Sequence, residues 1–118
     1  MADSPLLSKS KSFALAIIKV CNEVKSSKHE SVLTNQLIRS GTSIGANVHE
    51  GRRAQSRADF LAKMSIALKE ANETYYWLRL LHRTEYISQK EFESMKQDAD
   101  ELIRILVAIC KTASESRK

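Results

Sequence analysis

The sequence predicts an all-α protein that folds as an antiparallel up-down-up-down four-helix bundle. The chain has 118 residues with one proline and three glycines, so long stretches lack the residues that interrupt helices. Apolar residues recur at steps of three and four over four such stretches, which is the spacing of one helix face. We therefore expect a single domain, 1–118, long enough to bury one core, with helices at roughly 8–25, 31–50, 57–84 and 89–113.

The first helix, 8–25, places Phe13, Ile17, Cys21 and Val24 at helical spacing along one face. A serine near its start, Ser8 or Ser10, is expected to cap it. The polar residues 26–29 that follow have the length and composition of a connection between antiparallel helices.

The second helix, 31–50, contains two glycines four residues apart, Gly41 and Gly45, which fall on one helix face. Because glycine inside a helix costs roughly 1 kcal/mol relative to alanine, the pair indicates a thin face that lets a neighbouring backbone come close. Ser31 is the expected N-cap, with Thr34 as the alternative. Gly51 is expected to stop the helix.

The third and fourth helices begin with capping signals. Ser56 precedes Asp59 by three residues, and Ser88 precedes Glu91 by three, which is the spacing of a capping box. The fourth helix also carries a second apolar stripe beside its core-facing residues, and this stripe predicts an interface with another subunit. The stripe consists of Ile103, Val107 and Cys110.

Positive charge is concentrated in two parts of the chain, which has a net charge of +5. The first 29 residues hold five lysines against two acids, and residues 51–58 hold three arginines and no acid. Local basic excess attracts phosphate backbones, although a charge of this size is also ordinary for a soluble domain. The expected nucleic-acid contacts are Lys9, Lys11, Arg52, Arg53 and Arg57.

Catalytic and metal-binding patterns were sought and not found, so we expect no enzyme activity, no cofactor and no metal. His49-Glu50 begins like a zinc-protease motif, but Arg53 stands where the second histidine ligand belongs. Two cysteines and three scattered histidines give no metal-ligand spacing. No apolar run approaches the roughly 18 residues of a membrane span, and no secretory signal is present. A cytoplasmic protein with reduced cysteines and no membrane contact is expected.

One polar constellation links the second and third predicted helices. If these helices pack antiparallel, Arg39 can meet an acid of the third helix, where Glu70 and Glu73 lie one turn apart. We predict that Arg39 and Glu73 form a structural pair that fixes helix register, as buried polar pairs do in other bundles. A catalytic role for these acids lacks a partner base or metal.

A family resemblance is carried by the same second helix. The segments Leu37–Ser40 and Ser43–Val48, followed by Glu50-Gly51, resemble the signature of the four-helix bundle family named for the 23S rRNA intervening-sequence protein, also labelled S23 ribosomal protein. The run Ala71–Leu78 is similar to the third helix of that family. The resemblance extends from Phe13 to the end of the last helix.

The resemblance implies a protomer that assembles into a homopentameric ring and a link to RNA. Together with the basic segments, it leads us to expect a non-enzymatic oligomeric scaffold that associates with RNA or other nucleic acid through basic surface patches. We expect weak sequence preference, because no base-reading motif or stacking platform is present. The alternative is a protein-interaction module whose ring presents helix faces to a partner protein.

Overall fold

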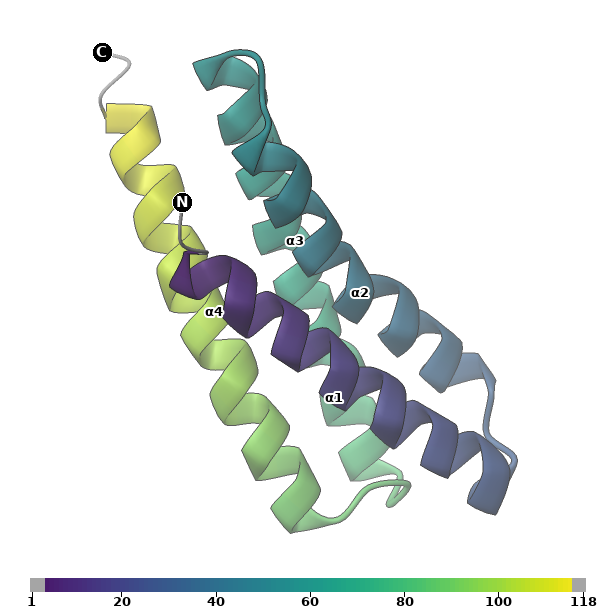
Figure 1. Cartoon of the computed structure of the whole chain (residues 1–118). Coiled ribbons are helices and arrows are strands. Elements are labelled where there is room, and N and C mark those ends of the chain that lie inside the picture. The colour runs from purple at the N-terminus through teal and green to yellow at the C-terminus, as the bar shows by residue number, and fades with distance from the viewer. Residues whose placement is uncertain (1–3, 116–118) are drawn as a thin grey trace.

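The computed structural model describes residues 4–115, with side chains described for residues 4–112, and this part of the chain contains four α-helices and no strand. The helices lie alongside one another (Figure 1), and the described part is elongated, with principal extents of 49 × 24 × 22 Å. They are α1 (Pro5–Lys28), α2 (Val32–Arg52), α3 (Arg57–Arg83) and α4 (Gln89–Glu115).

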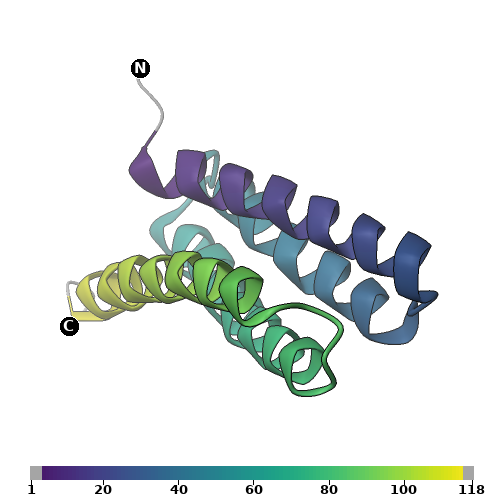
Figure 2. The same ribbon diagram turned by 90° about the horizontal axis from the view of Figure 1, so that it is seen from below.

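Each helix packs against two others: α1 and α3 both contact α2, and α1 and α3 both contact α4. Figure 2 shows α1 and α4 on opposite sides of the view, and their contact is the least extensive of the four. In Figure 1, α1 begins beside the middle of α4, so the ends of α2, α3 and α4 extend beyond it. All four helices supply fully buried side chains to one core, including Phe13, Ile17, Leu37, Ile44, Leu78, Leu81, Leu102 and Leu106.

The first helix starts earlier and ends later than the sequence predicted. Ser4 is the N-cap, because its Oγ accepts a hydrogen bond from the Leu7 N–H at 3.1 Å, and Pro5 takes the first helical position, where it needs no donor. The prediction that Ser8 or Ser10 caps α1 is therefore wrong. The helix continues to Lys28 through the residues predicted as a loop, and ends at His29, whose φ of 57° is left-handed.

The second helix has a different cap and a different end from those predicted. Ser31 stands at the N-cap position but makes no side-chain capping bond. The Glu30 carboxylate caps instead, accepting from the N–H groups of Leu33 at 2.7 Å and Thr34 at 3.0 Å. Gly51 does not stop α2, which runs to Arg52, and it has no positive φ. A Cβ at Gly51 would lie 3.3 Å from Cβ of Lys63, so this glycine allows close packing on α3.

The capping signals of the last two helices are confirmed. The Asp59 N–H donates to Ser56 Oγ at 3.0 Å. At the start of α4, the Glu91 N–H donates to Ser88 Oγ at 3.1 Å and the Ser88 N–H donates to a Glu91 carboxylate oxygen at 3.0 Å, which completes a reciprocal box. No helix among the described residues is long and apolar enough to cross a membrane.

Candidate functional site

A groove of about 670 Å³ runs between α1 and α2 and brings together basic residues from distant parts of the sequence. We call it the cationic groove. It is lined on α1 by Leu7, Ser8, Ser10, Lys11 and Ala14, and on α2 and its C-cap by Thr42, Gly45, Ala46, His49, Arg52 and Arg53.

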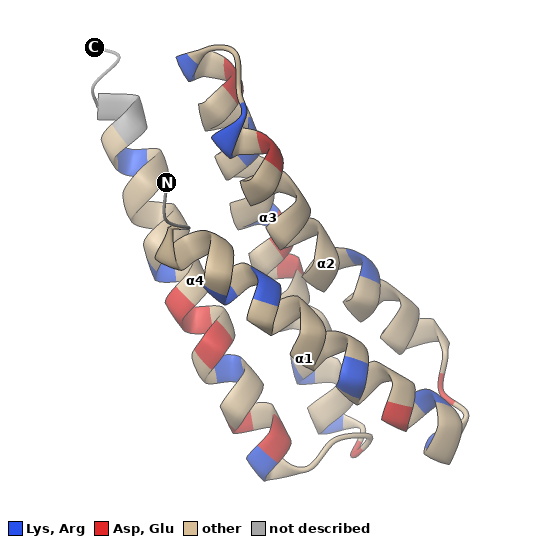
Figure 3. Ribbon diagram, viewed as in Figure 1, with Lys and Arg blue, Asp and Glu red and all other residues tan. Residues whose placement is uncertain are grey.

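The charges that line this groove have one sign. Lys11, Arg52 and Arg53 are basic, His49 lies among them, and none of the described residues that line the groove is acidic. No described carboxylate forms an ion pair with Lys11 or with the Arg53 side chain. In Figure 3, basic residues appear along α1 and at the α2–α3 turn, whereas α4 carries a run of acids. The groove is therefore a region of positive potential that favours an anionic ligand.

The helical repeat places these side chains together. On α2, His49 and Arg53 are four residues apart, and Ala46 and Arg52 flank them on the same side of the helix at steps of three. Small residues form the floor: Gly45 lies over Ser10, which is fully buried. Two hydroxyl groups of the lining donate to carbonyl oxygens of their own helices, Ser10 to Leu7 at 3.0 Å and Thr42 to Ile38 at 2.7 Å. The protons of these two hydroxyl groups are thus already used, so an anion in the groove would depend on donors such as Lys11 and Arg53.

Two of the five residues expected to contact nucleic acid lie outside the groove. Lys9 forms an ion pair with Glu101 of α4. The hydrogen bond and charge of Lys9 lower the pKa of that carboxyl group, so the charge of Lys9 is already matched by an acid. Arg57 borders a separate recess between α3 and α4, beside Phe60 and Ile109. The groove thus unites Lys11, Arg52 and Arg53 only.

His49 is the groove residue that the sequence analysis missed. In the sequence it resembles the first half of a metal motif, whereas in the structure it lies among the basic residues of the groove. Its place three residues before Arg52 and four before Arg53 puts it on the same helix face as the basic pair. That spacing was the available signal. The approach of Lys11 from α1 was not readable from spacing, because it depends on how the two helices pack.

The structure brings Arg39 and Glu73 together as part of a larger cluster. The Arg39 guanidinium forms ion pairs with Glu73 and with Glu70, the latter at 3.1 Å, and its Nε donates to Gln36 at 3.2 Å. Glu73 also accepts a hydrogen bond from Trp77 Nε1 at 3.0 Å. The Arg39 side chain is half exposed and Glu70 is nearly buried. This arrangement links α2 to α3.

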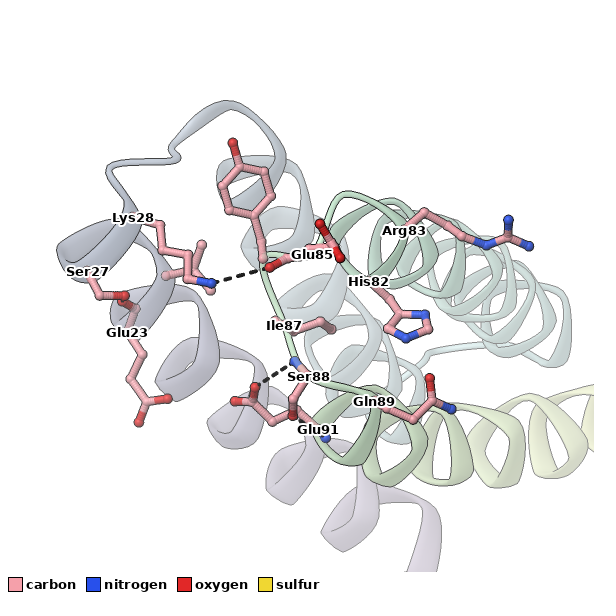
Figure 4. Close-up of a pocket in the computed structure, with 12 residues that line it drawn as sticks. Glu23, Ser27, Lys28, His82, Arg83, Glu85, Ile87, Ser88, Gln89 and Glu91 are labelled. Atoms are coloured by element: carbon pink, nitrogen blue, oxygen red, sulfur yellow. Dashed lines mark hydrogen bonds between the residues drawn. The ribbon is translucent and has the colours of Figure 1, made fainter.

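A second cavity, of about 680 Å³, lies at the other end of the molecule between α1 and the α3–α4 turn (Figure 4). Its lining mixes charges: Lys28 and Arg83 stand among Glu23, Glu85 and Glu91. Lys28 Nζ donates to the Glu85 carbonyl at 3.2 Å. Because both acidic and basic residues line this cavity, it favours a polyanion far less than the cationic groove does.

Comparison with known proteins identifies the family. The sequence model of the 23S rRNA-intervening sequence protein family matches residues 3–108. The chain belongs to this family. Comparison with curated proteins found no match. Among solved structures, this family member is similar to a protein of unknown function from the S23 ribosomal protein family of Bacteroides thetaiotaomicron. The two are 49% identical with a TM-score of 0.88, over 90% of this chain and 98% of the other.

No candidate metal-binding site is found in the described part of this family member. No group of three or more His, Cys, Asp or Glu residues is gathered there in a way that could hold a metal ion. The cationic groove is thus the site with the clearest chemical character, and that character is attraction of anions.

Proposed function

We propose that this protein is a non-enzymatic, oligomeric scaffold that binds RNA or other nucleic acid through the cationic groove. The observation that carries the proposal is the convergence of Lys11, Arg52 and Arg53 from two helices in a groove whose described lining has no acid. Phosphate oxygens accept hydrogen bonds from Lys and Arg, and release of counterions from the backbone supplies most of the affinity. The name of the family supports a connection with ribosomal RNA.

Recognition in this proposal is of the backbone and not of the bases. None of the described residues that line the groove is Phe, Tyr or Trp, and His49 supplies its one aromatic ring, so the groove has no row of aromatic side chains on which successive bases stack. Lysine and arginine contacts to phosphate position a nucleic acid without reading its sequence. We therefore expect structured RNAs of different sequence to bind with similar affinity.

Assembly into a ring would multiply the net positive charge of the single chain. The proposal takes the chain as an antiparallel up-down-up-down four-helix bundle in the cytoplasm that forms a homopentameric ring, as its family resemblance implies. Five copies of a chain with charge +5 would carry about +25, which would strengthen attraction to a polyanion. Light scattering of the purified protein should give about 67 kDa for five chains of 13.3 kDa. A mass of 13.3 kDa at micromolar concentration would contradict the ring.

Binding is tested by fluorescence anisotropy of a labelled RNA hairpin across a salt series. The dissociation constant should rise steeply as salt increases, because each neutralised phosphate contributes about −0.7 to −0.9 to the slope of log K against log salt. Absence of binding at 50 mM salt would reject the proposal.

The alternative, a protein-interaction module, is supported by a different surface. Tyr76 on α3 is 54% exposed and lies edge-on to Trp77, with ring centroids 5.1 Å apart. Exposed aromatic residues are frequent anchors of protein interfaces. Association with a protein partner that depends on Tyr76, and changes little with salt, would favour this alternative over nucleic-acid binding.

A further inference from the structure

An apolar cavity of about 470 Å³ opens where α1 stops short of the other helices. We call it the apolar cavity. All four helices contribute to its lining: Leu6 from α1, Val48 from α2, Phe60 and Met64 from α3, and Ile105 and Ile109 from α4. Its size lies within the roughly 300–1,000 Å³ range of small-molecule sites, which are typically apolar with a few polar groups.

The cavity has a buried floor and partly exposed walls. Leu6, Val48 and Met64 are buried, whereas Phe60, Ile105 and Ile109 are only partly buried. Water that contacts these three large side chains is displaced favourably by an apolar occupant. The cavity therefore favours a ligand with a hydrocarbon portion.

Arg52 joins the apolar cavity to the cationic groove, because it lines both. The other polar residue at the cavity, Ser4, uses its hydroxyl oxygen to cap α1 through Leu7. Arg52 therefore borders two different surfaces. The cavity offers hydrocarbon side chains to a ligand, and the groove offers Lys11, His49 and Arg53. A hydrocarbon chain that ends in an anionic head has the matching chemistry.

We propose that the apolar cavity and the cationic groove together form a binding site for a single-chain amphiphile with a phosphate monoester head. The hydrocarbon chain of the ligand occupies the apolar cavity, and its phosphate lies in the cationic groove at Lys11 and Arg53. The ligand is taken up as a monomer from solution. This site does not depend on nucleic-acid binding, so either proposal can fail without the other.

The test is calorimetric titration of the full chain with butyl phosphate and decyl phosphate below the concentration at which decyl phosphate forms micelles. Burial of each methylene is worth up to about fourfold in affinity, so decyl phosphate should bind at least tenfold more tightly than butyl phosphate. Ile109→Gln should remove most of this difference, whereas Ile66→Gln should keep it, because Ile66 is an exposed apolar residue of α3 that does not line the cavity. Arg53→Gln should weaken the binding of decyl phosphate and leave the binding of decanol unchanged. Circular dichroism confirms that each variant is folded.

Three results would overturn the proposal. Equal affinity for butyl and decyl phosphate would show that the cavity takes no chain. Binding to vesicles of phosphatidylcholine and phosphatidylglycerol without binding of the monomeric probe would assign the surface to a membrane. Failure of decyl phosphate to bind, together with a smaller mass by light scattering for Ile109→Gln, would show that a second copy of the chain covers the cavity.

Discussion

At the scale of single residues, two of the three glycines in α2, Gly41 and Gly45, face α1 and meet different surroundings there. A Cβ at Gly41 would lie 3.0 Å from Cγ2 and 3.2 Å from Cγ1 of Ile17, which is fully buried. A Cβ at Gly45 would lie 3.5 Å from Ser10 Oγ and 3.7 Å from the Ser10 carbonyl oxygen, which are ordinary contacts. Of these two glycines, Gly41 is therefore the one at which a side chain would press on its neighbour, although both were predicted to form one thin face.

Alanine substitutions separate the two cases. Both variants gain roughly 1 kcal/mol of helix propensity, but Gly41→Ala must push Ile17 within a packed core, and overpacking costs about 1–3 kcal/mol. In urea denaturation, Gly45→Ala should be more stable than the parent protein, and Gly41→Ala less stable than Gly45→Ala by about 1–2 kcal/mol. Equal stabilities of the two variants would contradict this account of the α1–α2 contact.

The two cysteines should differ sharply in reactivity. Cys21 is fully buried, its thiol donates to the Thr34 carbonyl with Sγ 3.6 Å from the oxygen, and burial raises its pKa to about 12. Cys110 is partly exposed. Because the thiolate is the reactive form, a thiol reagent at pH 8 should modify Cys110 in the folded protein and Cys21 only after unfolding. Mass spectrometry of the labelled protein identifies the site, and rapid native labelling of Cys21 would contradict its assigned burial.

The raised pKa of Cys21 also sets a direction for stability. Above pH 9 the unfolded chain ionises this thiol while the folded chain keeps its proton, so the contribution of Cys21 is complete below that pH and is lost as pH rises toward 12. Stability measured from pH 8 to 11 should therefore fall less steeply in Cys21→Ala than in the parent protein.

At the scale of helices, the ion pairs of Arg39 with Glu70 and Glu73 join α2 to α3. Removing Arg39 would leave Glu70, whose side chain is 11% exposed, without the cation that compensates it. We expect Arg39→Met to lower the free energy of unfolding by about 1–2 kcal/mol, since an uncompensated, nearly buried polar group is costly. The matched control is Lys96→Met, which breaks an exposed ion pair with Asp100. It should change the free energy of unfolding by less than about 1 kcal/mol.

A second set of measurements tests whether the Arg39 ion pairs set the register of α2 on α3. Replacing Arg39 together with Glu70, its more buried acidic partner, as in Arg39→Met with Glu70→Leu, should recover much of the lost stability, because apolar groups of similar size often replace a buried pair without loss. The other partner, Glu73, keeps its hydrogen bond from Trp77. If Arg39→Met leaves the protein as stable and as uniquely assembled as before, the pair does not fix register.

The helices were predictable from the sequence wherever the signal is local. The serine and acid at the starts of α3 and α4 are three residues apart and need no tertiary contact, so both caps were predicted correctly. Ser4 was missed as the cap of α1 because several serines follow it, and the sequence does not rank them. Glu30 was missed because a side chain one residue before the N-cap took over the capping role.

The candidate site was predictable only in part, for a similar reason. Arg52 and Arg53 are neighbours in sequence, so their shared location needed no fold. Lys11 reaches them through the packing of α1 on α2, and Lys9 is matched by Glu101 from α4. Both relations join residues that are distant in the chain, and helical spacing carries no information about such contacts.

At the scale of the whole molecule, charge is unevenly distributed over the four helices. Basic residues gather in the cationic groove, while α4 carries Asp98, Asp100 and Glu101 on its middle turns (Figure 3). A polyanion is therefore expected to approach the α1–α2 side and to avoid α4. The small net charge of +5 does not reveal this asymmetry.

The most direct test of the central claim compares two double variants that lose the same charge from different places. Arg52→Ala/Arg53→Ala removes two groove residues, and Arg83→Ala/Lys90→Ala removes two exposed cations near the opposite end. In anisotropy titrations of an RNA hairpin across a salt series, the groove variant should bind more weakly and show a salt slope smaller in magnitude by about 1.5–2. The control should keep nearly the slope of the parent protein. Equal losses in both variants would show that binding follows net charge alone and would contradict a nucleic-acid site in the groove.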